Sequence, residues 1–394
     1  MVMFSRRKES GAVSLFLVIF AMLLITVVTL GFLRIMLNDQ QQASDNDLSK
    51  SAYDSSLAGV EDAKRALIYY RTVCGSGDVA ACNNVRDRIN SGVCNDGLSD
   101  VVAVTANKEV PVQQQLSAND KNLNQAYTCV KINLDTPDYL GTIQANTSKL
   151  IPLTSDKDFT SVKIEWYSAE DLGAKTTTVN LLDVSRGQDA ALFLQSNWVA
   201  ARPSLLRTQL MQVGTSFTLK DFDVANPSIA QSNADTLFLY PTGQTGVKRT
   251  VVEPLSFSDD AHQSIAVSGP SAPKPVRCSG NLDGGGYACS TEIELPQAVG
   301  QSDTKRAAYL RLTPLYNASH FRITLGQGAL FSGVQPSIDS TGRANDLYRR
   351  VESRVDLINT AYPFPESAVD LTGNLCKDFL VTDRADLSVN NCTP

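Results

Sequence analysis

The chain has 394 residues, with 35 Lys plus Arg against 41 Asp plus Glu and two histidines, so its net charge is −6. This acidic balance, with no dense basic block beyond Arg6-Arg7-Lys8, argues against nucleic acid as the main partner. The part that follows residue 71 is long enough to bury one large core or two medium ones.

An uncharged apolar segment covers residues 12–33. As a helix it measures about 33 Å, which is enough to cross the hydrocarbon core of a bilayer. Basic residues precede the segment, and Asp39, Asp45 and Asp47 follow it. The positive-inside rule then predicts a cytoplasmic N-terminus, with everything after Leu37 outside. A secretory signal peptide would have a shorter apolar region and a small-residue cleavage site, so we expect a membrane anchor instead.

Helical spacing continues beyond the apolar segment, and no proline occurs before Pro111. The sequence therefore predicts one helix over 12–71, about 90 Å long. Its outer half carries an apolar stripe of mostly small residues, which we expect to pack on a globular part. We expect four larger residues to widen this stripe: Tyr53, Leu57, Val60 and Leu67. The predicted packing face consists of Leu48, Ala52, Ser55, Gly59 and Ala63.

The N-terminus combines a basic leader that ends in Arg6-Arg7-Lys8-Glu9-Ser10-Gly11 with an apolar start, Ala12-Val13-Ser14-Leu15-Phe16. This region resembles the type IV prepilins and pseudopilins, and the segment 51–61 is similar to the alanine-rich helix of the PilX-type minor pilins. The resemblance covers about the first seventy residues. It implies that a prepilin peptidase cuts between Gly11 and Ala12, which leaves 1–11 as a cytoplasmic leader.

The fifth residue after the implied cleavage is Phe16, where most pilins carry a glutamate. In that family the glutamate neutralises the N-terminal amine of a neighbouring subunit, because an unpaired charge is costly in an apolar core. A subunit at the tip has no such neighbour above it. The resemblance therefore implies a tip or priming subunit, whereas Phe16 in a permanent anchor is the alternative.

Eight cysteines all follow the apolar segment, which fits an oxidising compartment outside the cytoplasm. A zinc site is not expected, since the chain has no Cys-x-x-Cys pair. Cys278 and Cys289 enclose a glycine-rich stretch and are predicted to pair across a hairpin. Cys376 and Cys392 are placed like the C-terminal disulfide loop of pilins, so the resemblance implies that they pair. The other four cysteines allow three pairings, and they are Cys74, Cys82, Cys94 and Cys129.

The exported part is predicted to be mostly antiparallel β-structure with one short helix around 83–89, so the fold class is α+β. A Ser-, Asp- and Pro-rich stretch at 257–275 reads as a linker or long loop. It would separate two β-rich parts, 72–256 and 276–394. The predicted strands are 101–105, 127–134, 161–166, 204–213, 307–312, 321–325 and 350–357.

No motif of an active site is present: the sequence lacks a Gly-x-Ser-x-Gly elbow, a P-loop and a His-Glu-x-x-His pair. A catalytic triad would need His262 or His320, and both are expected to be solvated or strand-edge residues. Asp283 before three glycines fits either a calcium loop or a tight turn. We therefore expect no enzyme, no cofactor and no small-molecule substrate.

Together these features predict a minor subunit of a type IV pilus-like filament, placed at its tip or priming its assembly. Its large extracellular domain would serve assembly, adhesion or twitching motility. The expected partners are other pilin subunits, the pilus assembly machinery, the prepilin peptidase and the membrane. The expected location is a single-pass membrane protein that becomes part of a surface filament. The alternative is a membrane-anchored extracytoplasmic binding protein that does not polymerise.

Overall fold

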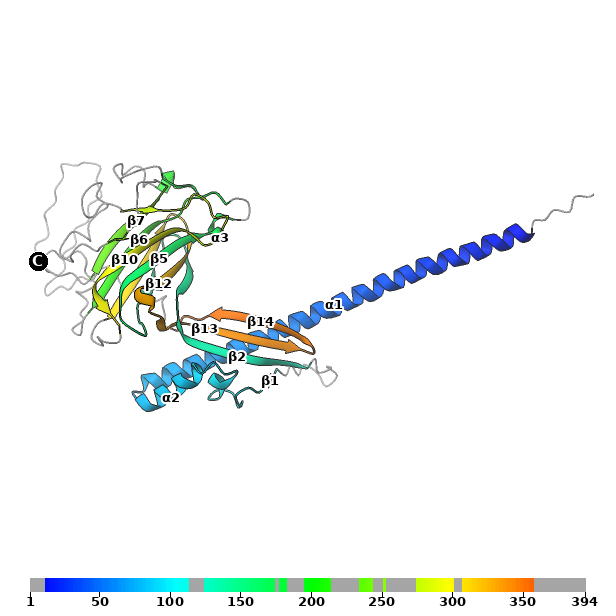
Figure 1. The fold of residues 1–394 in the computed structure, drawn as a ribbon, viewed down its shortest axis with the longest axis horizontal. Coiled ribbons are helices and arrows are strands. Elements are labelled where there is room, and N and C mark those ends of the chain that lie inside the picture. The colour runs from blue at the N-terminus through cyan, green and yellow to red at the C-terminus, as the bar shows by residue number, and fades with distance from the viewer. Residues whose placement is uncertain are drawn as a thin grey trace, which may run out of the picture. The chain divides into compact units, whose positions relative to one another are not determined.

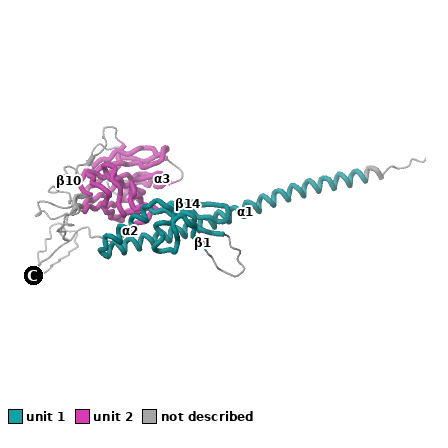
Figure 2. The backbone as a smooth tube through the Cα atoms, turned by 60° about the horizontal axis from the view of Figure 1, so that its bottom comes forward, with its two compact units in different colours: residues 1–132, 338–353 teal, residues 133–337, 354–394 magenta. Residues whose placement is uncertain are grey.

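The computed structural model describes residues 11–112, 124–173, 177–182, 195–213, 234–243, 251–252, 274–300 and 307–357. The chain forms two compact units, which Figure 2 colours separately. Unit 1 comprises residues 1–132 and 338–353, and unit 2 comprises residues 133–337 and 354–394.

The N-terminal helix α1 (Gly11–Gly75) runs without interruption for 65 residues (Figure 1). At the standard rise this is about 97 Å of helix. The predicted helix over 12–71 is thus confirmed, and it continues four residues further. The helix stops where Gly75 is followed closely by Gly77, whose φ of +85° is a left-handed conformation that glycine adopts readily.

The sheet of unit 1 has the strand order β1-β2-β13-β14. Its strands are β1 (Val110–Pro111), β2 (Gln125–Thr136), β13 (Phe331–Ala344) and β14 (Leu347–Arg354). The outer half of α1 lies along this sheet (Figure 1). Alternate residues of β13, namely Ile338, Ser340 and Ala344, are fully buried. This period of two is expected for a strand with one face against a helix and one face toward solvent.

Two short helices complete unit 1: α2 (Val79–Ile89), capped by the side chain of Asp78, and the 3₁₀ turn η1 (Asp96–Leu98). The predicted short helix therefore exists, whereas the predicted strand over 101–105 is wrong. The amides of Val101 and Val102 both donate to the carbonyl oxygen of Leu98, so the chain continues the turn that η1 begins. The run lacks the strict alternation of apolar and polar residues that marks a half-buried strand.

Unit 2 contains two five-stranded sheets, with the orders β3-β12-β5-β10-β8 and β4-β11-β6-β7-β9. Most neighbouring strands are antiparallel, and the pairs β10–β8 and β7–β9 are parallel. The first sheet contains β3 (Tyr139–Ile143), β12 (Ser319–Leu325), β5 (Phe159–Ser168), β10 (Tyr287–Val299) and β8 (Val251–Val252). The second contains β4 (Lys149–Pro152), β11 (Ala307–Leu315), β6 (Leu205–Val213), β7 (Ala234–Thr242) and β9 (Lys274–Arg277).

Both sheets of unit 2 contribute to one hydrophobic cluster, so they pack on each other as a sandwich. Ile164 and Trp166 of β5 enter it from the first sheet, and Leu210 of β6 and Leu310 of β11 enter it from the second. Short helical pieces, α3 (Ala169–Leu172), η3 (Gln195–Asn197) and η5 (Gly326–Gly328), lie between strands. The α+β fold class predicted from the sequence is confirmed.

Six of the seven predicted strands coincide with observed ones, in β2, β5, β6, β11, β12 and β14. The division between the units falls inside β2, near the middle of β13 and at the end of β14. The predicted linker over 257–275 lies outside the described residues except for its last two, which begin β9.

Candidate functional site

The inner half of α1 exposes a continuous apolar surface. Every large hydrophobic side chain over 15–37 is exposed, and Phe16 is exposed to 75%. The segment is long and apolar enough to cross a membrane. Burying this surface in lipid or against other apolar helices removes it from water, which is the dominant favourable contribution to such association.

The polar groups within this apolar half bond to their own helix. The hydroxyl groups of Thr26 and Thr29 donate to the carbonyl oxygens of Met22 and Ile25, each at 2.8 Å. Hydrogen bonds within the segment spare these hydroxyls the cost of entering an apolar medium unpaired. Arg34 is the single charged residue between Leu15 and Leu37. It lies near the outer end, where a long basic side chain can reach the lipid headgroups.

The outer half of α1 packs on the unit 1 sheet through small residues. Ala52, Ser55, Gly59 and Ala63 are buried as predicted, while Leu48 is half-buried. Of the four residues predicted to widen this face, Val60 and Leu67 are buried, whereas Tyr53 and Leu57 are exposed, so the prediction is wrong for those two.

Two glycines allow α1 and the sheet to approach closely. A Cβ on Gly59 would meet Ser340 Oγ at 2.5 Å and Val130 Cγ2 at 2.7 Å. A Cβ on Gly342 of β13 would overlap the backbone of α1 at Ala52 and Ser56. The buried hydroxyl of Ser340 then donates to the carbonyl oxygen of Ser56 at 2.7 Å, which links strand and helix directly.

A second polar link joins α1 to β2. The Tyr127 hydroxyl donates to Asp62 Oδ2 at 2.8 Å, and Arg65 Nη1 donates to Asp62 Oδ1 at 2.9 Å. Burial, together with the hydrogen bond to Asp62, raises the pKa of Tyr127 well above its ordinary value. The tyrosine therefore remains a neutral donor, and the outer half of α1 is held to the sheet by polar as well as apolar contacts.

Three disulfides are present among the described residues. Cys74–Cys82 joins the end of α1 to α2, and Cys94–Cys129 joins the loop after α2 to β2. Cys278–Cys289 is the hairpin pair predicted from the sequence. The other predicted pair, Cys376 and Cys392, lies outside the described residues. The apolar helix and the disulfides together indicate an exported or membrane-anchored protein.

The predicted processing position lies at the start of α1. Gly11 is its first residue and Ala12 its second. Phe16 follows one turn later, in the exposed apolar half. The residues over 15–37 include no Asp or Glu, so this surface offers no carboxylate to neutralise an amine.

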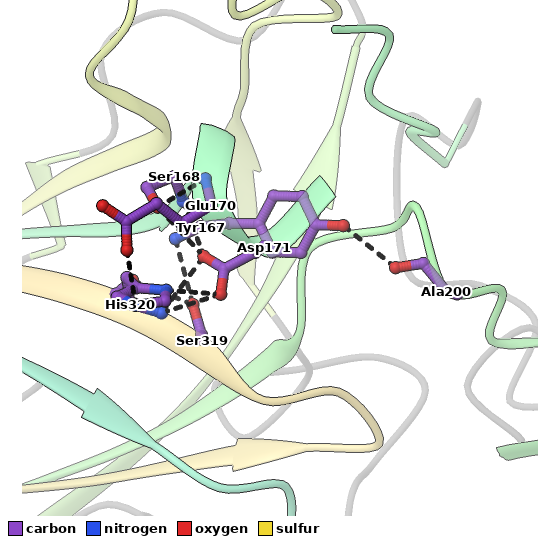
Figure 3. Close-up of polar contacts among 7 residues, drawn as sticks. All are labelled: Tyr167, Ser168, Glu170, Asp171, Ala200, Ser319 and His320. Atoms are coloured by element: carbon purple, nitrogen blue, oxygen red, sulfur yellow. Dashed lines mark hydrogen bonds and ion pairs between the residues drawn. The ribbon is translucent and has the colours of Figure 1, made fainter. Parts of the chain in front are cut away.

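A polar cluster in unit 2 surrounds His320, as Figure 3 shows. Its Nδ1 lies 2.8 Å from Asp171 Oδ1, and its Nε2 lies 3.0 Å from Glu170 Oε2. The side chain of Asp171 is 6% exposed and also accepts the backbone amides of Ser168 and His320. Sequence reasoning missed this cluster because Asp171 and His320 are 149 positions apart.

The arrangement around His320 supports a structural role. Tyr167 has a φ of +66°, an uncommon conformation for a large side chain, and this turn brings α3 against β12. The hydroxyl of Ser319 accepts the Tyr167 amide at 3.0 Å and donates to the His320 carbonyl oxygen at 3.0 Å. It therefore makes no hydrogen bond to the imidazole of the kind that an activated nucleophile needs.

The turn at Asp283 is closed by its own side chains. Asp283 and Asn281 exchange hydrogen bonds, and those from Thr177 and Asn281 lower the pKa of Asp283. Within the described part of the chain, no group of three or more His, Cys, Asp or Glu side chains is arranged to hold a metal ion. His262, the other histidine considered, lies outside the described residues.

Comparison with known proteins adds no family. No family model matches this chain, and no curated protein matches it by sequence. The long apolar N-terminal helix packed against antiparallel sheets is consistent with a pilin-like architecture.

Proposed function

We propose that the protein is a minor subunit of a type IV pilus-like filament, of the PilX-type or pseudopilin kind. It presents a large extracellular part for assembly, adhesion or twitching motility. The observation that carries the proposal is α1, a single helix whose inner half is exposed and apolar and whose outer half is built into a folded unit. Such a helix can exchange lipid for neighbouring helices without unfolding the part that it carries.

Phe16 supports the proposed position at the tip of the filament. A phenylalanine adds apolar surface at the place where a carboxylate would neutralise a neighbouring amine. A subunit at the tip, or one that primes assembly, has no neighbour above it that needs this carboxylate. The bulk of the exported part agrees with a low copy number, because a part this large would crowd its neighbours in every layer.

The first experiment determines the N-terminal residue of the protein isolated from the membranes of its native host. Mass spectrometry of the intact chain is expected to show Ala12 as the first residue. The Gly11→Val variant is expected to retain the leader, because the implied cleavage follows that glycine. Gly31→Ala is the matched control, since Gly31 has no atom within 4 Å of an added Cβ and lies far from the cut.

Retention of Arg6 to Gly11 in the wild-type protein would instead support the alternative, a single-pass anchored binding protein that does not polymerise. The same exposed apolar half serves as a permanent anchor in that case. Shearing surface filaments from cells is an independent experiment that distinguishes the filament subunit from the permanent anchor. The proposal expects the chain in the sheared fraction at a low ratio to the main subunit, whereas a permanent anchor stays with the cells.

A high ratio in the sheared fraction, with the chain in every layer, would support a filament protein but contradict the tip position. The stoichiometry is measured by quantitative mass spectrometry of peptides from unit 2, because these peptides lie outside the membrane segment. Neither result depends on identifying what the exported part touches.

A further inference from the structure

β14 forms an edge of the unit 1 sheet, and no strand among the described residues pairs with its outer side. An unpaired edge offers a row of backbone donors and acceptors to another strand. We infer that β14 pairs in antiparallel fashion with β14 of a second copy of this chain. The inference goes beyond the proposed function and does not rest on it.

The side chains of β14 alternate between two faces. Arg349 Nε donates to Ser49 Oγ of α1 at 2.8 Å, so the odd-numbered residues face the helix. Arg350 makes two hydrogen bonds of 2.6 Å to Asp339 on the opposite face, where Tyr348 is 57% exposed. Residues directly opposite each other in an antiparallel ladder share a face. Even-numbered residues of one copy therefore oppose even-numbered residues of the other.

This constraint leaves few two-fold registers, and charge distinguishes them. A register centred on Arg349, Arg350 or Glu352 places like charges opposite each other at its centre, which is unfavourable. Registers centred nearer the strand ends pair few residues.

A register centred on Val351 places Arg350 opposite Glu352 twice, once on each side of the two-fold axis. It also places Tyr348 opposite Arg354, whose guanidinium already donates to Asp138 within its own copy, so this pair adds no charge contact. The strand Leu347–Arg354 is thus self-complementary in this register.

The side chains of Arg350 and Glu352 are both exposed, although Arg350 is also paired with Asp339 of its own copy. The Arg350 side chain is 70% exposed, and it retains one terminal nitrogen beyond the two that bind Asp339. Glu352 is exposed. Charged residues on an edge strand can also serve to keep the edge unpaired. If the charges join two copies, reversing one of them weakens the pair. If they keep the edge unpaired, the wild type forms no pair that the reversal could weaken.

The pairing also fixes how the two copies face each other. β14 lies over the outer half of α1 in unit 1 and crosses it obliquely (Figure 1). A two-fold axis that reverses β14 therefore reverses α1 as well, and the apolar halves of the two helices point in opposite directions. Two such copies cannot share one bilayer, so each belongs to a separate membrane patch.

The test uses the full chain reconstituted at one copy per lipid nanodisc, in two populations that carry different dyes. Two-colour coincidence and mass photometry report pairs of discs. The wild type is expected to form disc pairs whose dissociation constant rises with salt. Arg350→Glu alone places Glu opposite Glu, and Glu352→Arg alone places Arg opposite Arg. Each is expected to weaken pairing about tenfold or more.

The mixture of the two variants is decisive. In a mixed pair, the glutamate introduced by Arg350→Glu faces the arginine introduced by Glu352→Arg, and the unchanged Glu352 of the first copy faces the unchanged Arg350 of the second. Mixed pairs are therefore expected to form at the wild-type dissociation constant. Glu61→Arg is the control. The Glu61 side chain is exposed on α1, so this variant makes the same charge change away from β14 and is expected to leave pairing unchanged.

A second comparison covers the case in which Arg350→Glu does not fold. Glu352→Arg mixed with wild type keeps one of the two ion pairs, so its dissociation constant is expected to be intermediate. The inference is overturned if wild-type discs stay single at about 100 µM, or if Glu352→Arg pairs as well as the wild type.

Discussion

Single atoms decide how closely α1 and its sheet approach. Gly342 lies where any side chain would overlap the helix backbone at Ala52 and Ser56. Backbone cannot shift as a flexible side chain can, so the strand must move away if a methyl group is added.

We expect Gly342→Ala to lower the free energy of unfolding of unit 1 by about 2–3 kcal/mol. Urea titration of the full chain in detergent, followed by the near-ultraviolet signal, measures the change. Gly284→Ala is the control, because nothing lies within 4 Å of a Cβ there and its φ is not in the left-handed region. An unchanged midpoint for Gly342→Ala would mean that the contact between α1 and β13 is looser than described.

The charge of Glu165 is expected to affect how the free energy of unfolding depends on pH in the acid range. Its burial raises the pKa of the carboxyl, but hydrogen bonds from Arg322 and Lys163 outweigh this and lower the pKa overall. A carboxyl with a lowered pKa in the folded state stabilises the protein above its unfolded pKa of about 4.3. That stabilisation is lost as the pH falls through the lower folded pKa.

Glu165→Gln is therefore expected to cost about 1–2 kcal/mol at pH 7 and to cost progressively less below about pH 4. Thermal unfolding of both proteins across the acid range measures the convergence of the two curves. Glu294→Gln on the neighbouring strand β10 is a suitable control, because Glu294 is exposed. A difference that stays constant down to about pH 2 would contradict the role given to the ionised carboxylate.

At the scale of elements, the disulfides of unit 1 differ in the length of chain that they close. Cys94–Cys129 spans 35 positions and Cys74–Cys82 spans 8. On a chain-entropy estimate the longer loop stabilises the folded state by about 4 kcal/mol and the shorter by about 2.5 kcal/mol. Replacing both cysteines of a pair by serine is expected to show this order.

Denaturant titration of the two double variants measures the difference, about 1 kcal/mol larger for Cys94→Ser with Cys129→Ser. The Cys278→Ser, Cys289→Ser variant serves as a reference in unit 2, where the disulfide closes 11 positions. The opposite order would mean that local packing around α2 dominates the entropy of the closed loops.

The sequence was informative about elements whose pattern is local. The uninterrupted spacing of α1 and the small residues at Ala52, Ser55, Gly59 and Ala63 predicted both the helix and its buried face. The exposure of Tyr53 was not predictable, because the strand that packs on this part of α1, with Gly342 against the helix backbone, lies almost 300 residues later. The run at 101–105 was misread since apolar composition without alternation does not distinguish a strand from a turn.

The pairing of the four cysteines in unit 1 could not be predicted from the sequence either. It depends on α2 folding back near the end of α1 and on β2 lying beside the loop after α2. The carboxylate partners of His320 were hidden for the same reason, although Ser168 and Asp171 do carry the spacing of a capping box.

At the scale of the whole molecule, the two units are interleaved along the chain. Unit 1 takes its last strand from residues far beyond those that build most of unit 2. The sequence predicted two successive parts, 72–256 and 276–394. Changes in composition indicate linkers, but they do not show that a unit takes strands from distant parts of the chain. The functional surfaces were more accessible: the apolar half of α1 is evident from composition alone, whereas the edge position of β14 required the sheet order.

The disulfides of unit 1 have a mechanical consequence. If the inner end of α1 is held and β2 is pulled, the load passes from Cys74 to Cys82, along the chain to Cys94, and then across sulfur to Cys129. The stretch 95–128 lies outside this path and cannot be drawn out while the bridge is intact. Tension therefore reaches β2 through covalent bonds. The residues between the two cysteines, which would extend under load if the disulfide were reduced, stay unextended.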